Sequence, residues 1–256
     1  FVKSKGDLIT RMDSDDRMAP EKLAILKSLL LQNGRGHLAT GFVQYFSEEG
    51  LKEGYQNYEK WLNDLTKEGN NFHEIYKECV IPSPNWMVFR EDLIRCGGFG
   101  SNVYPEDYDL CFRFYKIGLE VIENQKVTHF WRDYSNRTSR TSETYSDNKY
   151  FELKVPYFLE LDYGENRPVV LWGAGRKGKK IAKILVEKNI PFHWVCNTER
   201  RWGTEVYGVI LDNFSKIKSL KNPQIIIAVA APDGLIEIQD FLEKNKLKKK
   251  THFFHF

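Results

Sequence analysis

Hydrophobic residues in the first 164 positions recur in short runs of mixed spacing, which indicates strands and helices in irregular order. After Pro20, leucines recur every three or four positions up to Leu30, as on one face of a helix. We predict helices at residues 20–30, 55–65, 72–79, 91–96, 106–117 and 150–161. We predict strands at residues 7–12, 37–46, 85–89, 120–122 and 126–131. The polar stretch 133–147 is interpreted as a loop or lid.

From residue 165 onward, apolar strands and amphipathic helices alternate regularly. We predict strands at 169–172, 192–196, 224–230 and 252–256, with helices at 176–188, 214–220 and 235–245. This alternation is typical of a parallel sheet with helices on its faces. The fold class is therefore α/β, with one domain at residues 1–164 and a second, smaller one at residues 165–256.

The composition is that of a folded protein. Hydrophobic residues make up 41% of the 256 positions and aromatic residues 14%, which supplies a proper core and excludes intrinsic disorder. No apolar run reaches the ~18 residues that span a bilayer. The four cysteines form no CxxC pair, which favours a reducing cytoplasmic compartment.

The net charge of +3 hides an asymmetry between the two domains. Residues 1–164 carry 21 Lys and Arg against 26 Asp and Glu, whereas residues 165–256 carry 17 against 9. The basic domain would suit an anionic ligand or surface, and ordinary solvated faces are the alternative. No nucleic-acid-binding motif is present, so we expect no nucleic acid partner.

An acidic cluster follows the first predicted strand. Asp13, Asp15 and Asp16 lie within four residues, and their mutual repulsion makes a bound cation one way to hold them together. Hard oxygen ligands suit Mg²⁺ or Mn²⁺, which in turn suit a diphosphate partner. The alternative is a solvated turn with a helix cap, which Asp also favours.

A second acidic cluster opens the helix predicted at residues 106–117. The dipole at a helix start favours Glu106, Asp107 and Asp109 without any further role, so helix capping is one interpretation. The other is a carboxylate that acts as general base on an acceptor hydroxyl.

Together these segments resemble a known enzyme family. ITRMDSDDRMAPEKL resembles the DXD segment of family 2 glycosyltransferases of the GT-A fold, and CGGFGSNVYPEDYDLCFR resembles their Gly-Gly turn and ED segment. IPSPNWMVF is similar to the strand between them. The resemblance covers about residues 3–140 and implies an inverting transfer of a sugar from a nucleotide-diphospho-sugar.

The resemblance also implies roles for individual residues. Asp15 would bind Mn²⁺ or Mg²⁺ at the diphosphate, with Asp13 assisting at the metal or the ribose. Asp107 would deprotonate the acceptor hydroxyl, and Glu106 would shape that site. The acceptor would be a carbohydrate or lipid-linked, in synthesis of a bacterial cell-surface polysaccharide on the cytoplasmic side, with peripheral membrane association left open.

Further residues are candidates for the site, and each also has a purely structural interpretation. Trp86 is a candidate sugar-stacking platform, or simply a core residue. His129 is a candidate third metal ligand, or a packed strand residue. Arg132, Arg137 and Arg140 could bind phosphates, since guanidinium groups match phosphate oxygens, or belong to a solvated loop.

The chain departs from the family at its start. Members place a strand, a helix and a strand before the DXD segment, and that unit binds the base and ribose. Here about six residues precede the first strand. We therefore expect a fragment, and expect the 256-residue chain by itself to transfer little or no sugar.

The second domain begins with a glycine loop. Gly173, Gly175 and Gly178 form G-x-G-x-x-G between a strand and a helix, the context of a dinucleotide-binding turn. The acid expected at the end of the next strand is replaced by Asn197, which argues against NAD. The segment resembles Rossmann-like accessory domains of sugar-modifying enzymes. Binding of a nucleotide or phosphosugar and a purely structural or docking role both remain open.

Two functions therefore compete. One is a metal-dependent glycosyltransferase with a Rossmann-like appendage. The other is a non-catalytic module with a degenerate transferase fold, which binds a nucleotide or docks to a larger assembly. A dehydrogenase is disfavoured because the ribose-binding acid is missing.

Overall fold

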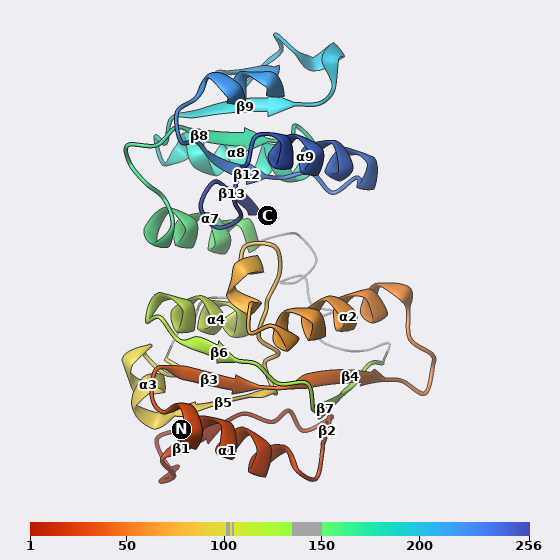
Figure 1. Ribbon diagram of the computed structural model, residues 1–256, viewed down its shortest axis with the longest axis vertical. Helices are drawn as coiled ribbons and strands as arrows, with labels where there is room; N and C mark the ends of the chain where they lie inside the picture. The colour runs from red at the N-terminus through yellow and green to blue at the C-terminus, as the bar shows by residue number, and fades with distance from the viewer. Residues whose placement is uncertain (101–102, 104, 135–149) are drawn as a thin grey trace. The chain divides into compact units, whose positions relative to one another are not determined.

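The computed structural model describes residues 1–100, 103, 105–134 and 150–256, and it divides into two compact units, Phe1–Asn148 and Lys149–Phe256. Each unit is an α/β structure with its own sheets (Figure 1). The predicted loop or lid at 133–147 lies almost entirely outside the described residues. No described helix is both long and apolar enough to cross a membrane.

The first unit is built on a four-stranded sheet in the order β1-β5-β3-β6. The strands are β1 (Leu8–Thr10), β5 (Trp86–Phe89), β3 (His37–Thr40) and β6 (Glu120–Ile122). The pairs β1–β5 and β5–β3 are antiparallel, whereas β3 and β6 are parallel. Residues that follow β1 therefore leave the sheet at the end where β5 begins.

Helices cover both faces of this sheet (Figure 1). On one face, Leu26 and Leu30 of α1 (Lys22–Asn33) pack against Ala39 and Met87. On the other face lies α4 (Glu106–Lys116), where the rings of Trp86 and Phe114 meet edge to face at 5.3 Å. The short helix α3 (Arg90–Arg95) follows β5 directly.

A smaller sheet in the order β2-β7-β4 lies beside the first. It consists of β2 (Arg17–Met18), β7 (Val127–Arg132) and β4 (Phe42–Phe46), and α2 (Glu53–Lys67) packs on β4. Asn63 of α2 bonds both the amide and the carbonyl of Val43. This sheet places His129 and Arg132 of β7 next to the residues around Arg17.

Two of the predicted elements of this unit are wrong. The single strand predicted at residues 37–46 is two strands in different sheets, because the chain crosses Thr128 at Gly41, where a Cβ would lie 2.4 Å from Thr128 Oγ1. The helix predicted at 72–79 is only a short 3-10 turn, Asn71–Glu74. Its residues are held by tertiary contacts instead, such as the bond from Asn71 Nδ2 to the Val80 carbonyl.

The second unit has a six-stranded sheet in the order β10-β11-β9-β8-β12-β13. Its strands are β8 (Val169–Trp172), β9 (Phe192–Cys196), β10 (Glu205–Val206), β11 (Val209–Asn213), β12 (Gln224–Ile227) and β13 (Phe253–His255). All neighbours are parallel except the β10–β11 hairpin, which the sequence analysis missed. The parallel strands run 3-2-1-4-5 in chain order, which is the six-stranded Rossmann order 3-2-1-4-5-6 without its last strand.

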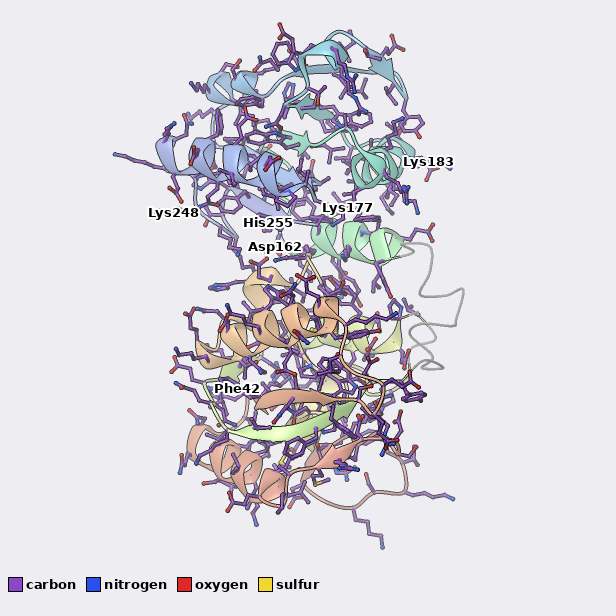
Figure 2. The ribbon with its side chains drawn as sticks, turned by 90° about the vertical axis from the view of Figure 1, so that its right-hand side faces the viewer. Phe42, Asp162, Lys177, Lys183, Lys248 and His255 are labelled. Atoms are coloured by element: carbon purple, nitrogen blue, oxygen red, sulfur yellow. The ribbon has the colours of Figure 1, made fainter. Side chains whose placement is uncertain are left out.

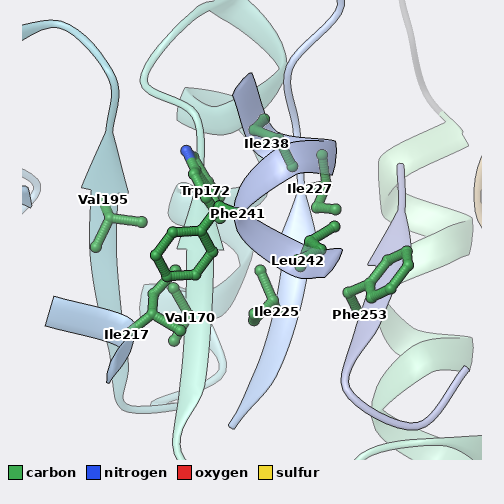
Figure 3. Packing of buried hydrophobic residues seen from close by; sticks show 10 residues of the cluster. All are labelled: Val170, Trp172, Val195, Ile217, Ile225, Ile227, Ile238, Phe241, Leu242 and Phe253. Carbon is green, nitrogen blue, oxygen red and sulfur yellow. The ribbon is translucent and has the colours of Figure 1, made fainter. Parts of the chain in front are cut away.

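The core of this unit shows why the strands read as continuous apolar runs. Alternate residues, among them Val170, Trp172, Ile225 and Ile227, pack with Ile238 and Phe241 of α9 (Pro232–Lys244) on one face (Figure 3). Phe214, at the start of the 3-10 helix Phe214–Ser219, stacks on Trp172 at 5.2 Å. The residues between them along each strand point to the other face of the sheet and are buried as well. Both faces of the sheet are therefore covered.

The boundary between the units lies before α7 (Tyr150–Leu161), whereas the sequence analysis placed this helix in the first domain. α7 packs on α8 (Arg176–Glu187), and its Phe158 meets Phe254 and Phe256 edge to face at 5.0 and 5.8 Å. The apolar face of α7 is thus buried by residues near the end of the chain, which no local pattern could indicate.

Gly41 gives a test of the crossing between the two sheets. We expect Gly41→Ala to lower the free energy of unfolding by about 1–3 kcal/mol, because the added Cβ meets Thr128 and the Lys126 carbonyl. The matched control is Gly54→Ala in α2, where a Cβ meets nothing within 4 Å. It should stabilise the chain by up to about 1 kcal/mol through helix propensity. Thermal unfolding measures both, and a neutral Gly41→Ala would contradict this account.

Candidate active site

The acidic turn Asp13–Asp16 follows β1, and the structure separates its three carboxylates. The Asp16 amide donates to the Asp13 carbonyl at 3.4 Å, which closes the turn. The Asp16 carboxylate points inward and is 1% exposed, whereas Asp13 is 29% exposed and Asp15 is exposed. The carboxylates of Asp13 and Asp15 are therefore the two that a ligand in solvent can reach.

Arg11 joins this turn to the start of α4. Its Nε donates to Asp13 Oδ1 at 3.2 Å, and its Nη1 lies 3.9 Å from Glu106 Oε1. The guanidinium thus lies between two acidic clusters that are more than 90 residues apart in sequence. The structure thus joins Asp13 to Glu106 through Arg11, a residue that the sequence alone did not single out.

Asp107 lies in the first turn of α4, after Pro105. Its Oδ1 accepts the amide hydrogen of Tyr108 at 2.8 Å. Burial and the neighbouring charge of Glu106 raise the pKa of Asp107 to about 6, against smaller opposing effects of the backbone and Arg11. A carboxylate with this pKa is a stronger base than an ordinary Asp and is still ionised near neutral pH.

Asp109 has a structural role. Its Oδ2 accepts from Arg113 Nε at 2.8 Å, one turn further along α4. Arg113 Nη1 donates in turn to the carbonyls of Cys96 and Gly98, both at 2.7 Å. This ion pair anchors the Gly97-Gly98 turn to α4.

His129 is engaged by protein groups on both ring nitrogens. Its Nε2 lies 2.9 Å from Asp16 Oδ2, and its Nδ1 lies 3.3 Å from Lys22 Nζ. The ring is fully buried. In this arrangement no ring nitrogen is left for a metal, so the geometry favours a packed strand residue over the predicted third ligand.

Lys22 is the unexpected member of this group. The side chain is fully buried in the first turn of α1, and Nζ donates to the Pro84 carbonyl at 2.5 Å. Burial lowers the pKa of Lys22 to about 8, opposed by the charges of Asp16 and Asp13. Its sequence position, between a proline and a leucine stripe, carries no signal of burial.

The structure also gives the surroundings of Trp86 and Arg132. Trp86 is 1% exposed and packs against Phe114 and Phe99, so it is a core residue and not a sugar platform. Arg132 Nε donates to the Asp15 carbonyl at 2.9 Å, which ties it to the acidic turn. Tyr134, absent from the sequence analysis, donates its hydroxyl to Asp15 Oδ2 at 3.1 Å. Arg137 and Arg140 lie outside the described residues.

Among the described residues, no group of three or more His, Cys, Asp and Glu side chains could by itself hold a metal. Asp13 and Asp15 offer two carboxylates. Mg²⁺ in enzymes is commonly held by one or two carboxylates together with substrate phosphates and water, so this donor set fits an ion that arrives with a diphosphate.

The glycine loop of the second unit lies at a pocket of about 430 Å³. Gly173 has φ +127° and Gly178 lies so close to the Gly173 carbonyl that a Cβ there would be 1.9 Å from its oxygen. Gly175 differs, since a Cβ would meet nothing within 4 Å. The pocket lies at the carboxyl ends of the strands, beside β8 and β12, where the strand order reverses.

The side chains around this pocket are basic. Arg176, Lys177 and Arg201 line it, and its lining contains no acid. Arg201 Nη1 donates to the Ala174 carbonyl at 2.6 Å, across the loop. Lys177, seen with His255 in Figure 2, donates from Nζ to the Phe256 carbonyl at 2.9 Å.

Asn197 occupies the position where a dinucleotide-binding turn has its ribose-binding acid. Its Oδ1 accepts from Trp172 Nε1 at 2.7 Å, and its Nδ2 donates to Glu237 Oε2 at 2.5 Å. Both ends of the amide are thus bound to protein groups, which supports the expectation that this position does not bind a ribose as an acid would.

Comparison with known proteins agrees with the family resemblance expected for the first unit. The model of the family "Glycosyl transferase family 2" matches residues 1–97. Residues 1–97 are therefore similar to family 2 glycosyltransferases. The matched segment contains β1, the acidic turn and β5, and it ends before Glu106 and Asp107.

A curated relative supports the same family. The O-antigen biosynthesis glycosyltransferase WbnJ of Escherichia coli is 33% identical over 120 residues, which is 44% of this chain and 41% of that protein. The matched part thus spans less than half of the relative. Among solved structures, one titled "Crystal structure of RSP, a Rex-family repressor" aligns over 81% of this chain and 88% of that chain, with 12% identity and a TM-score of 0.32.

The raised pKa of Asp107 gives a stability test of the first unit. Asp107 keeps its proton up to about pH 6 in the folded chain but only to about pH 4 when unfolded, so the wild type loses stability as pH rises between these values. Asp107→Asn does not titrate and keeps the acceptor for the Tyr108 amide. It should be more stable than wild type by about 1–3 kcal/mol near pH 8, and by little near pH 4.

Thermal unfolding at both pH values measures this difference. Asp64→Asn on the exposed side of α2 is the matched control and should change stability at neither pH. An Asp107→Asn chain that is no more stable than wild type near pH 8 would contradict the burial argument.

Proposed function

We propose that the first unit carries the metal and acceptor side of an inverting glycosyltransferase, which moves a sugar from a nucleotide-diphospho-sugar to an acceptor hydroxyl. The observation that carries the proposal is the Arg11 bridge, at 3.2 Å to Asp13 and 3.9 Å to Glu106. Arg11 thereby joins Asp13 of the acidic turn to Glu106, the neighbour in sequence of the half-buried Asp107. This is the division of labour that glycosyl transfer needs.

Asp107 is the proposed general base. Its carboxylate takes the proton of the acceptor hydroxyl while the hydroxyl oxygen forms a bond to the anomeric carbon. The bond from that carbon to the diphosphate oxygen breaks, the nucleoside diphosphate leaves with the electron pair, and the configuration at the carbon inverts. Glu106 raises the pKa of Asp107 and, together with Arg11, shapes the approach to it.

Asp13 and Asp15 are the proposed ligands of Mn²⁺ or Mg²⁺. When bound, the ion would supply charge stabilisation to the departing diphosphate. Arg11 holds Asp13, and Tyr134 and Arg132 hold the side chain and carbonyl of Asp15. These contacts orient both acids before any ligand arrives.

The biological setting follows from the relative. WbnJ is named for O-antigen biosynthesis, so we propose that this chain acts in synthesis of a cell-surface polysaccharide. The acceptor would then be a carbohydrate, free or lipid-linked, and the reaction would take place on the cytoplasmic side, where nucleotide sugars are made.

Turnover of the purified protein tests this proposal. We measure release of nucleoside diphosphate from a panel of nucleotide-diphospho-sugars with Mn²⁺, at high protein concentration because turnover is expected to be low. Asp107→Asn and Asp15→Asn should each lower release by at least ~10²-fold, in line with loss of a general base or of charge stabilisation. Asp64→Asn should not change it. Release that persists unchanged in Asp107→Asn would refute the assignment of the base.

A second function is favoured by the pocket of the second unit, and we propose that it binds a phosphate-bearing nucleotide or sugar. Three cations and no acid line about 430 Å³, a volume common for small-molecule sites. The first turn of α8 contains no acidic residue, and no side chain caps it. A helix start of this kind presents backbone amide groups to an anion.

Gly175 adds a separate argument. Gly173 and Gly178 are required by the packing of the protein, whereas Gly175 has φ −77° and open space where a side chain would be. The fold itself therefore does not demand glycine there. A ligand phosphate that approaches the backbone closely would demand it.

Calorimetric titration distinguishes the ligands of this pocket. We expect UDP-glucose or another nucleotide sugar to bind more tightly than NADH, because Asn197 replaces the ribose-binding acid. Gly175→Val and Arg201→Gln should each weaken binding by about tenfold or more without loss of folding. Lys183→Gln, on an exposed part of α8 labelled in Figure 2, is the matched control. Absence of heat with all ligands at millimolar concentration would refute the binding function.

A further inference from the structure

A buried polar chain runs from α1 to the acidic turn. It links Lys22 Nζ to His129 Nδ1 at 3.3 Å, and His129 Nε2 to Asp16 Oδ2 at 2.9 Å. The Lys22 and His129 side chains are fully buried, and the carboxylate of Asp16 is 1% exposed. We infer that Lys22, His129 and Asp16 are positioning residues, which fix the turn so that the carboxylates of Asp13 and Asp15 face a common cation.

The chemistry of the three groups allows one arrangement of protons. An ammonium group only donates, so Lys22 donates to the Pro84 carbonyl and to His129 Nδ1. The ring proton of His129 then lies on Nε2 and is donated to Asp16. The imidazole is thereby a neutral connector between a buried cation and a buried anion, and every polar atom of the connector has a partner.

The chain continues beyond Asp16 to the outward acids. Asp16 Oδ1 accepts the backbone amide of Arg132 at 2.8 Å, and Arg132 Nε donates to the Asp15 carbonyl at 2.9 Å. Arg132 therefore links the carboxylate of Asp16 to the carbonyl of Asp15, the residue before it. A displacement of Asp16 would therefore also move Asp15. Lys22 and His129 act on Asp15 through Asp16.

Stability alone is a poor explanation for this group. Replacing a buried ion pair by apolar side chains of similar volume is often neutral or stabilising, because desolvation of the charges offsets their attraction. Groups that hold the ligands of a metal, in contrast, commonly change metal affinity by about 10- to 100-fold when removed. Lys22, His129 and Asp16 together are called the relay below. Asp16 directly follows Asp15 in the chain, which agrees with the role of holding a metal ligand.

The inference rests on the proposed function of Asp13 and Asp15, so its test has two readouts. The first needs no metal: hydrogen–deuterium exchange of the peptide that contains residues 12–17. Lys22→Met and His129→Leu should raise exchange there. His129→Gln, which keeps a donor near the place of Nε2, should stay close to wild type. Thr66→Val removes a buried hydroxyl at the end of α2 and is the control for general destabilisation.

The second readout is binding of Mn²⁺ alone, followed by electron paramagnetic resonance, with Asp15→Asn as the variant that removes the site. Lys22→Met and His129→Leu should weaken binding by about tenfold or more, and Thr66→Val should not. The positioning role is overturned if Lys22→Met and His129→Leu both leave the exchange of residues 12–17 as in wild type. It is also overturned if they raise this exchange but leave the Mn²⁺ affinity unchanged. If the wild-type chain binds no Mn²⁺, the proposed metal site fails, and raised exchange still supports the fixing of the turn by the relay.

Discussion

Repulsion among three carboxylates in four residues is the constraint on which the site depends. The structure meets it by sending the three groups to different partners: Asp16 into the protein, Asp13 to Arg11 and Asp15 to Tyr134. Only the inward one is neutralised by buried groups. Asp13 and Asp15 keep their exposed negative charges. The turn and the start of α4 therefore both contribute negative potential to this part of the surface. The positive charge of Arg11, which lies between Asp13 and Glu106, reduces the repulsion between the two acidic segments.

Much of this arrangement could be predicted from the sequence, since local rules decide it. The start of α4 after Pro105, the helix after Pro20 and the strand–helix alternation beyond residue 165 all follow from periodicity and turn chemistry. The approach of the acidic turn to Glu106 followed from a family resemblance and not from spacing. The match of residues 1–97 now supports the part of that resemblance that contains the turn.

Other features depend on contacts between residues that are distant in sequence, and no local pattern reveals them. Gly41 reads as one more residue of an apolar strand until Thr128 is seen against it. Trp86 and His129 look like site residues by type, but burial places both in the interior. Lys22 is the inverse case, because a lysine on a helix reads as solvated surface. Burial of a single side chain is decided by the whole fold, so neither residue type nor period reveals it.

The inward direction of Asp16 has a consequence for how such a protein can diverge. Asp15 is exposed, so a lineage that adopts another donor chemistry could replace it without disturbing the interior. Asp16, His129 and Lys22 share their hydrogens in series, and loss of any one leaves a charged or polar neighbour unsatisfied. Substitutions among these three should therefore arise together in descendants, as a linked set, while the outward acid drifts by itself.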